Sequence, residues 1–112
     1  METSSNNYQT EETVEKKKTI NSQISGFEHY RPSIQLALFV LWRIHQKQYQ
    51  VGSRIFYEEV KEALSSNNRT YSLTAYKEAL AFLEGAGAVV NEVVIIEKVP
   101  SSLIQRYKIG HE

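Results

Sequence analysis

The 112-residue sequence contains no cysteine and no aspartate, and every acidic side chain is a glutamate. Without cysteine the chain can form no disulfide, no thiolate metal site and no thiol nucleophile. Without aspartate it lacks a residue on which metal-dependent phosphoryl transfer usually depends. No apolar run reaches the length of a membrane span, and the N-terminus lacks the basic and then apolar order of a secretory signal. We therefore expect a cytoplasmic protein without a membrane segment.

The charges of the chain balance, with 13 lysines and arginines against 13 glutamates. A strong basic excess would have indicated a nucleic-acid ligand, and the chain as a whole shows none. Its histidines, His29, His45 and His111, are far apart and lack a metal-binding spacing. The glutamates of residues 58–62 fall on the outward side of an expected helix, unlike the enclosed carboxylates of acid–base catalysts. These patterns predict no enzyme, cofactor, metal site or small-molecule ligand.

The first 24 residues are polar and include three consecutive lysines, Lys16, Lys17 and Lys18. Few large apolar side chains are available for burial there. We therefore expect a mobile N-terminal tail over residues 1–24 and one folded domain over residues 25–112. The lysines are typical either of a solvated tail or of one that holds an anionic partner, and both interpretations stay open.

A long helix is predicted over residues 32–47, with Pro32 in its first turn. One face at helical spacing is formed by Ile34, Ala37, Leu38, Leu41, Ile44 and His45. Two further stripes are also apolar, Phe39 with Trp42 and Leu36 with Val40. A helix that is apolar on several sides has to be covered on several sides, either by its own domain or by a second copy. We expect a homodimer through this helix.

The remaining elements follow from spacing and from residues that end helices. Residues 54–56 form a short strand, and a second helix extends from residue 56 to a break at residues 65–68. A third helix is predicted over residues 73–84, with Ser72 as its N-cap and Gly85 and Gly87 ending it. Two strands of an antiparallel hairpin then lie between about residues 92 and 109, because the last segment alternates in polarity.

This order of elements resembles the winged helix-turn-helix family. The local match is a small polar cap, an apolar helix face and a glycine leading into a strand, formed by Ser72, Tyr76, Ala79, Leu80, Leu83, Gly87, Ala88 and Val89. The resemblance covers about residues 32–110 and implies an α+β fold with three helices and a C-terminal β-hairpin wing. The whole chain is also similar to small winged-helix proteins of archaeal spindle-shaped viruses, which implies the host cytoplasm as its location.

The chain departs from the family pattern at two places. The turn before the third helix extends over residues 66–72, whereas the usual turn has about three or four residues. The outward face of the third helix carries one lysine and one glutamate, Lys77 and Glu78, and is not strongly basic. The second departure bears directly on the strength of any DNA binding.

The resemblance implies a double-stranded DNA-binding protein that regulates transcription, with the third helix in the major groove and the wing on the backbone. The side chains that would face bases are Thr74, Ala75, Lys77 and Glu78, with Ala81 beyond them. Phosphates would be bound at the N-terminus of that helix by Arg69, Tyr71 and Ser72. The wing would add Lys98, Arg106 and Lys108. Each set also fits a solvated polar surface.

A protein-binding winged helix without DNA binding is the alternative, favoured by the zero net charge and by Glu78 on the outward face. The two readings differ in the surface that they require. DNA binding requires that Arg69, Lys77, Arg106 and Lys108 share one surface. Protein binding requires an exposed apolar patch, which we expect around Phe39 and Trp42 or around Phe82.

Overall fold

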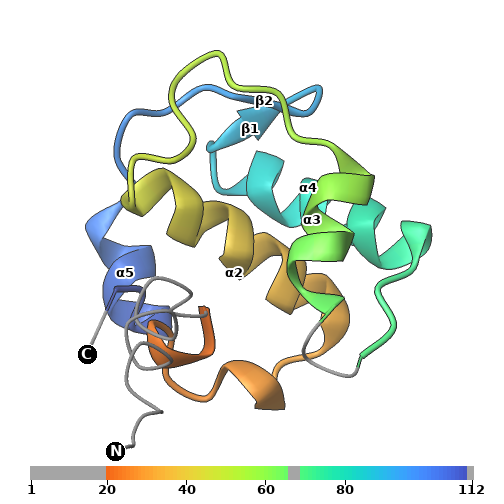
Figure 1. Cartoon of the computed structure of the whole chain (residues 1–112). Helices are drawn as coiled ribbons and strands as arrows, with labels where there is room; N and C mark the ends of the chain where they lie inside the picture. The colour runs from red at the N-terminus through yellow and green to blue at the C-terminus, as the bar shows by residue number, and fades with distance from the viewer. Residues whose placement is uncertain (1–19, 66–68, 111–112) are drawn as a thin grey trace, which may run out of the picture.

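The computed structural model describes residues 20–65 and 69–110, which form an α+β arrangement of helices around one small antiparallel hairpin (Figure 1). In chain order the elements are η2 (Ile20–Ser22), η3 (Phe27–His29), α2 (Pro32–His45), α3 (Tyr57–Ala63), α4 (Leu73–Gly85), β1 (Val89–Val90), β2 (Val93–Val94) and α5 (Ser101–Tyr107). The predicted α+β class is therefore confirmed. The described residues contain four α-helices rather than the three expected.

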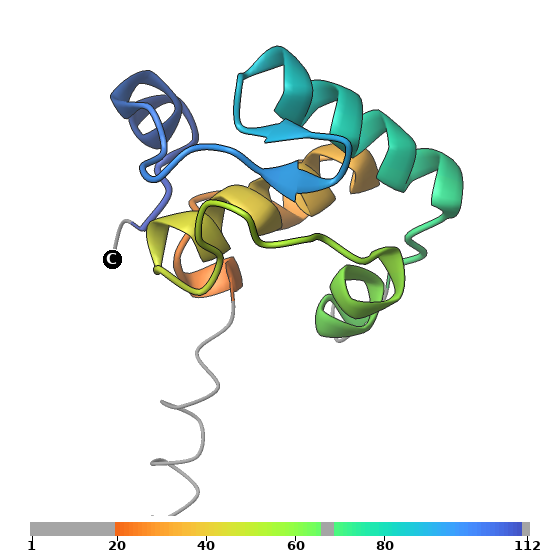
Figure 2. The same cartoon turned by 90° about the horizontal axis from the view of Figure 1, so that it is seen from above.

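Helix α2 is the central element, with α3, α4, α5 and the N-terminal turns around it (Figures 1 and 2). It begins with Pro32 at its first position, as predicted. Nine of its side chains are buried: Ser33, Gln35, Leu36, Ala37, Leu38, Phe39, Val40, Leu41 and Ile44. Because the chain itself covers this helix, its apolar character needs no second copy to explain it. The homodimer stays a prediction, now without an exposed face on α2 to support it.

The folded part begins earlier than predicted. Ile20 and Ile24 are buried in the core beside Phe27 of η3. The predicted tail boundary at residue 24 is therefore wrong, because these isoleucines supply apolar surface to the core. Residues 1–19, with the three lysines, lie outside the described residues.

A buried glutamine joins the N-terminal turns to the rest of the core. The Nε2 group of Gln35 donates hydrogen bonds to the carbonyls of Phe27, at 3.1 Å, and Tyr30, at 2.9 Å. Its Oε1 atom accepts a hydrogen bond from the hydroxyl of Tyr71, in the segment before α4. The amide nitrogen and oxygen of Gln35 and the hydroxyl of Tyr71 are thus all hydrogen-bonded within the protein, as buried polar groups need to be.

The hairpin is short, with Val89 opposite Val94 and Val90 opposite Val93. Its turn consists of Asn91 and Glu92, which both have positive φ angles, 52° and 66°, as two-residue hairpins of the I′ type require. A third segment joins the sheet, since Arg54 forms an antiparallel bridge with Val93. The predicted strand at residues 54–56 is thus reduced to a single bridge.

The C-terminal segment is a helix, so the predicted wing over residues 92–109 is wrong. The strands end at Val94, and residues 101–107 form α5. Pro100 precedes the helix, and its carbonyl accepts hydrogen bonds from Leu103 and Ile104 in the first turn. Leu103, Ile104 and Tyr107 are also spaced for one helical face, so the sequence is compatible both with the two-residue period of a strand and with the 3.6-residue period of a helix. No helix among residues 20–65 and 69–110 is long and apolar enough to cross a membrane.

Candidate nucleic-acid interface

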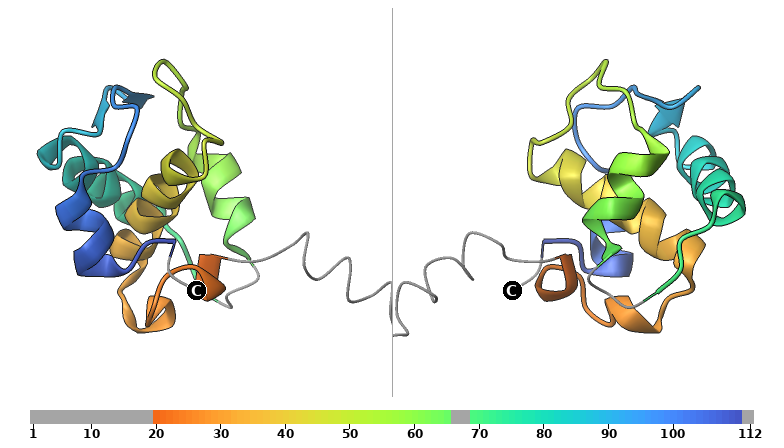
Figure 3. Two further views of the ribbon diagram at one scale, coloured as in Figure 1. Left: turned by 90° about the vertical axis from the view of Figure 1, so that its left-hand side faces the viewer. Right: turned by 45° about the vertical axis from the view of Figure 1, so that its right-hand side comes forward.

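Helix α4 lies along one edge of the molecule, with its inner face on α2 (Figures 2 and 3). Its buried residues are Tyr76, Ala79 and Leu83. The predicted cap is confirmed, because Ser72 Oγ accepts a hydrogen bond from the backbone N–H of Ala75 at 3.1 Å. At the other end Gly87 has a φ angle of 77°, the left-handed conformation that ends a helix.

The outer face of α4 is exposed to solvent along the whole helix. The exposed residues are Leu73, Thr74, Lys77, Glu78, Ala81, Glu84 and Gly85, and Ala75 is half-buried beside them. Of the predicted base-facing residues, Thr74, Lys77 and Glu78 are exposed, whereas Ala75 packs partly against the core. Thr74, Ala81 and Gly85 are small, so the backbone of α4 can come close to a bound surface at these positions. The charged residues are Lys77, Glu78 and Glu84, so the exposed positions carry one more negative than positive charge.

One flank of α4 is bordered by the hairpin turn and carries an arginine that sequence patterns did not single out. Arg54 Nη2 lies 3.1 Å from Glu92 Oε1. The other carboxylate oxygen of Glu92 accepts a hydrogen bond from the Tyr76 hydroxyl at 2.7 Å. The side chain of Arg54 is 57% exposed, with its guanidinium 5.5 Å from the ring centre of Phe56. Arg54 was missed because its partners are distant in sequence and meet only in the fold.

The same carboxylate changes the acid–base chemistry of Tyr76. Burial raises the pKa of Tyr76, and the hydrogen bond to Glu92 and the charge of Glu92 raise it further. All three effects favour the neutral phenol, because the phenolate would be formed away from water and beside a carboxylate. Tyr76 therefore acts as a hydrogen-bond donor that fixes α4 to the hairpin turn.

The opposite flank of α4 is bordered by η3 and α5 through three aromatic rings. Tyr107 of α5 lies with its ring centre 6.1 Å from Phe82 of α4 and 5.7 Å from Tyr30, both in edge-to-face contacts. The guanidinium of Arg106 is 5.9 Å from the ring centre of Tyr107. Arg106 is exposed, on a helix rather than on a strand, and is the sequence neighbour of the Tyr107 that packs on Phe82 of α4.

Two residues predicted to bind phosphate have structural partners. Tyr71 is only 3% exposed and donates its hydroxyl to Gln35, so its prediction as a DNA contact is wrong. Arg69 is exposed, but its Nη1 and Nη2 groups donate to the carbonyls of Tyr30, at 2.9 Å, and Glu28, at 3.2 Å. Arg69 therefore joins the segment before α4 to η3, and only its remaining N–H groups face outward.

The other two predicted wing residues lie away from α4. Lys98 belongs to the connection between β2 and α5 and lines a cavity at the C-terminal end of α2. Lys108 follows α5 in the left-handed conformation, with a φ angle of 56°. These lysines do not alternate with Arg106 on a ribbon, because that ribbon is not formed. Of the four cations required on one surface, Lys77 lies on the outer face of α4, Arg69 donates to the Tyr30 carbonyl, Arg106 lies over the Tyr107 ring, and Lys108 follows α5.

The apolar patches expected for a protein-binding module are largely covered. Phe39 is buried, and Trp42 and Phe82 are half-buried against the core. The large apolar side chains that are exposed lie elsewhere: Val51, Phe56, Leu73, Val90 and Ile95. Most of them come from the hairpin and from the segment bonded to it.

Within the described part of the chain, no group of three or more histidine, cysteine or acidic side chains is placed to hold a metal ion. No family model matches the chain, and searches of curated proteins and of solved structures also gave no match.

Proposed function

We propose that the chain is a double-stranded DNA-binding protein of the winged-helix kind that regulates transcription, with α4 in the major groove. One observation carries the proposal. The outer face of α4 is exposed over the whole helix and has an exposed arginine on each flank, Arg54 and Arg106. A helix about 10–12 Å across fits a major groove about 12 Å wide, with cations beside it for the two backbones.

The outer face of α4 supplies side chains that suit base edges. Thr74 can donate to or accept from a base, and Ala81 can contact a thymine methyl group. Lys77 reaches guanine or phosphate, whereas Glu78 is repelled unless it accepts from a cytosine amine. Because Lys77 and Glu78 have opposite charges, this pair favours discrimination between DNA sequences over strong non-specific attraction to DNA.

Backbone contacts are few in this arrangement. Arg54, Arg106 and the N-terminus of α4 provide about three phosphate contacts, which corresponds to a log–log salt slope of about −2.7. The hairpin adds no cation at its tip, because its turn holds Asn91 and the acidic Glu92. A single chain would therefore bind DNA weakly, and binding would be lost at moderate salt.

The test is fluorescence anisotropy of labelled duplexes with the full chain at about 50 and 200 mM salt, a range over which phosphate contacts weaken strongly. One duplex comes from upstream of the gene for this protein, and the other is its scrambled sequence. The variant Ala81→Glu places a carboxylate on the outer face of α4. It should weaken binding by at least about tenfold, because a like-charge contact at an interface costs several kcal/mol and about 1.4 kcal/mol already corresponds to tenfold.

The matched control is Ala63→Glu, which adds the same charge at an exposed alanine of α3. It should leave the affinity within about twofold, because this position is outside the proposed interface. Equal weakening by both variants would mean that α4 is not the reading element. Equal binding of both duplexes would mean a general DNA-binding protein rather than a regulator of one site.

A protein-interaction module is the second candidate. It is favoured by three exposed apolar residues in and around the hairpin: Val90 in β1, Ile95 directly after β2, and Phe56, two residues after the Arg54 bridge to Val93. Apolar surface of this kind often marks a site for another protein. Failure of the full chain to bind either duplex at the lower salt concentration would reject the DNA proposal and favour this one.

A further inference from the structure

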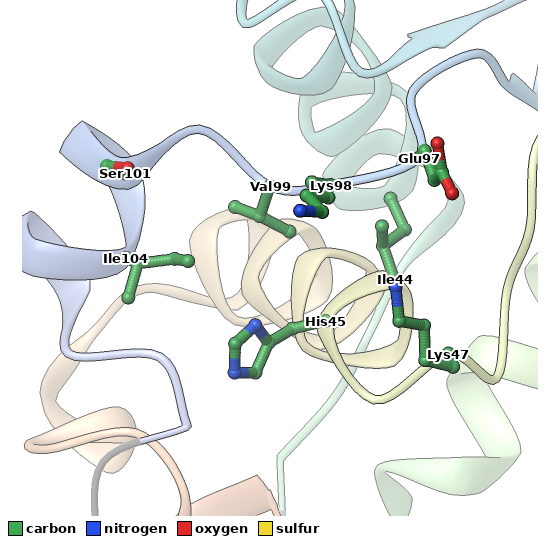
Figure 4. A pocket seen from close by; sticks show the side chains of 8 residues that line it. All are labelled: Ile44, His45, Lys47, Glu97, Lys98, Val99, Ser101 and Ile104. Atoms are coloured by element: carbon green, nitrogen blue, oxygen red, sulfur yellow. The ribbon is translucent and has the colours of Figure 1, made fainter.

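A cavity of about 280 Å³ lies at the C-terminal end of α2, between that helix, the connection from β2 to α5, and α5 itself (Figure 4). A second hollow of about 420 Å³ shares Lys47 and Glu97 with it and continues over Tyr49 and Val51. The two hollows are therefore neighbours, and the outer face of α4 lines neither of them.

The floor of the cavity is apolar. Ile44 is 1% exposed, Val99 is 5% exposed, and Ile104 of α5 is half-buried beside them. Figure 4 shows Ile104 on α5, Val99 on the connection before it, and Ile44 and His45 at the end of α2, around the same space. A purely ionic ligand would gain nothing from this floor, whereas an apolar group placed there is removed from water.

The rim of the cavity carries more positive than negative groups. The ammonium groups of Lys47 and Lys98 are exposed, and the imidazole of His45 and the hydroxyl of Ser101 add hydrogen-bonding atoms. The one acidic side chain of the lining is Glu97, whose carboxylate lies at the outer edge, apart from His45 and Ile104 (Figure 4). Two cations around an apolar floor are complementary to an anion with an apolar body.

We propose that this cavity is a binding site for a small amphiphilic anion, of the class of medium-chain carboxylates. The apolar chain lies on Ile44, Val99 and Ile104, and the carboxylate meets Lys47 and Lys98. Pockets for drug-sized ligands usually have volumes of about 300–1,000 Å³, so this cavity, at about 280 Å³, lies just below that range and fits a smaller ligand. The site is independent of whether α4 binds DNA.

Helix α5 contacts both the cavity and α4. Ile104 lines the cavity, and Tyr107, on the next turn of the same helix, packs on Phe82 of α4. A ligand bound in the cavity would therefore contact the same helix that packs on α4 through Tyr107.

The test is an NMR titration of the ¹⁵N-labelled full chain with sodium octanoate. Saturable shifts are expected in the amides of residues 44–47 and 97–104. Two further probes separate the parts of the ligand. Acetate has the charge without the apolar chain, and 1-octanol has the chain without the charge. Each should bind at least about tenfold more weakly than octanoate, because each lacks one of two contacts worth about 1.5 kcal/mol or more.

The double variant Lys47→Gln, Lys98→Gln should weaken octanoate binding about tenfold, because it removes both charge-assisted contacts. The matched control, Lys61→Gln with Lys77→Gln, changes two exposed lysines on α3 and α4 and should leave it unchanged. Three results would each overturn the proposal: no saturable shift in these amides, equal binding of octanoate and 1-octanol, or unaltered octanoate binding by the first double variant. Acetate binding as tightly as octanoate would do so too.

Discussion

The hydroxyl of Tyr76 donates a hydrogen bond to Glu92 Oε2 at 2.7 Å, while Glu92 Oε1 lies 3.1 Å from the guanidinium of Arg54. One carboxylate thus joins α4, the hairpin turn and the segment before α3. This side chain, together with the hydrogen bond from the Tyr76 hydroxyl to the Ile55 carbonyl at 3.3 Å, links α4 to the segment that carries Arg54. Substitutions here should therefore alter both stability and DNA binding.

The raised pKa of Tyr76 predicts a loss of stability at alkaline pH. A tyrosine whose pKa is higher in the folded than in the unfolded state contributes its full stability below the unfolded value, which is about 10. Above that pH the unfolded chain loses a proton that the folded chain keeps. The free energy of unfolding then falls by up to about 1.4 kcal/mol per pH unit until the folded pKa is reached. Burial also raises the pKa of Tyr49, which adds to the same trend.

The variant Tyr76→Phe should make this decline less steep, which urea unfolding between about pH 8 and pH 11 would measure. The control is Tyr107→Phe, at a half-buried tyrosine of α5. Its alkaline decline should match that of the wild type. If Tyr76→Phe gave the same decline as well, Tyr76 would not be the group that titrates.

The variant Glu92→Gln should tighten DNA binding. It removes a negative charge beside a phosphate backbone and frees Arg54 from an ion pair, while its amide oxygen can still accept from Tyr76. We expect about fivefold tighter binding at low salt and a smaller gain at high salt, because salt screens the removed charge. Anisotropy at both salt concentrations would measure this.

The companion variant Arg54→Gln should weaken binding and reduce the salt slope by about one. The control for both is Glu62→Gln, at an exposed glutamate of α3, which should leave affinity unchanged. Unaltered affinity in both Glu92→Gln and Arg54→Gln, in a chain that does bind DNA, would place this flank of α4 outside the interface.

Sequence patterns predicted the two long helices well, because each carries its own local signals. Helix α2 begins at a proline and is apolar at helical spacing, and α4 is capped by Ser72 and closed by glycines. The predicted boundaries of α4 differ from the observed ones by a single residue. These signals act within one or two turns and depend little on the rest of the chain.

Features that depend on distant residues could not be predicted in the same way. Residues 103–109 alternate in polarity, and only the packing of Tyr107 against Tyr30 and Phe82 separates a helix from a strand there. Tyr71 is a polar residue in a polar loop, and its burial follows from Gln35 of α2. The roles of Arg54 and Arg69 likewise follow from partners far along the chain.

The buried network of Gln35 predicts a large effect for Gln35→Met. Methionine has a similar length but leaves the Phe27 carbonyl and the Tyr71 hydroxyl without the partner that Gln35 provides. Since the variant loses three hydrogen bonds, each with a net contribution of about 0.5–1.5 kcal/mol, we expect a loss of about 2–4 kcal/mol in urea unfolding. Gln46→Met, at the exposed end of α2, should cost less than about 0.5 kcal/mol. Similar losses in the two variants would contradict the network.

The variant Gly110→Ala should be destabilising for two reasons. Gly110 has a φ angle of 75°, and a β-carbon there would lie 2.6 Å from His45 Nε2. A left-handed alanine costs about 1–2 kcal/mol, and displacement of the imidazole adds to this. In a His45→Ala background only the backbone cost should remain, so a double-mutant cycle would show coupling. Additive losses would mean that the imidazole moves aside freely.

The enclosure of α2 also sets the order in which the molecule opens. Its amide hydrogens reach water only when α4, the N-terminal turns and the core come away together. In contrast α5, which has no fully buried side chain, can detach by itself. Deuterium should therefore enter α5 first and α2 last. A local opening of α5 would displace Arg106 and part of the cavity lining. Helix α4 would stay packed on α2, the slowest-exchanging part of the chain.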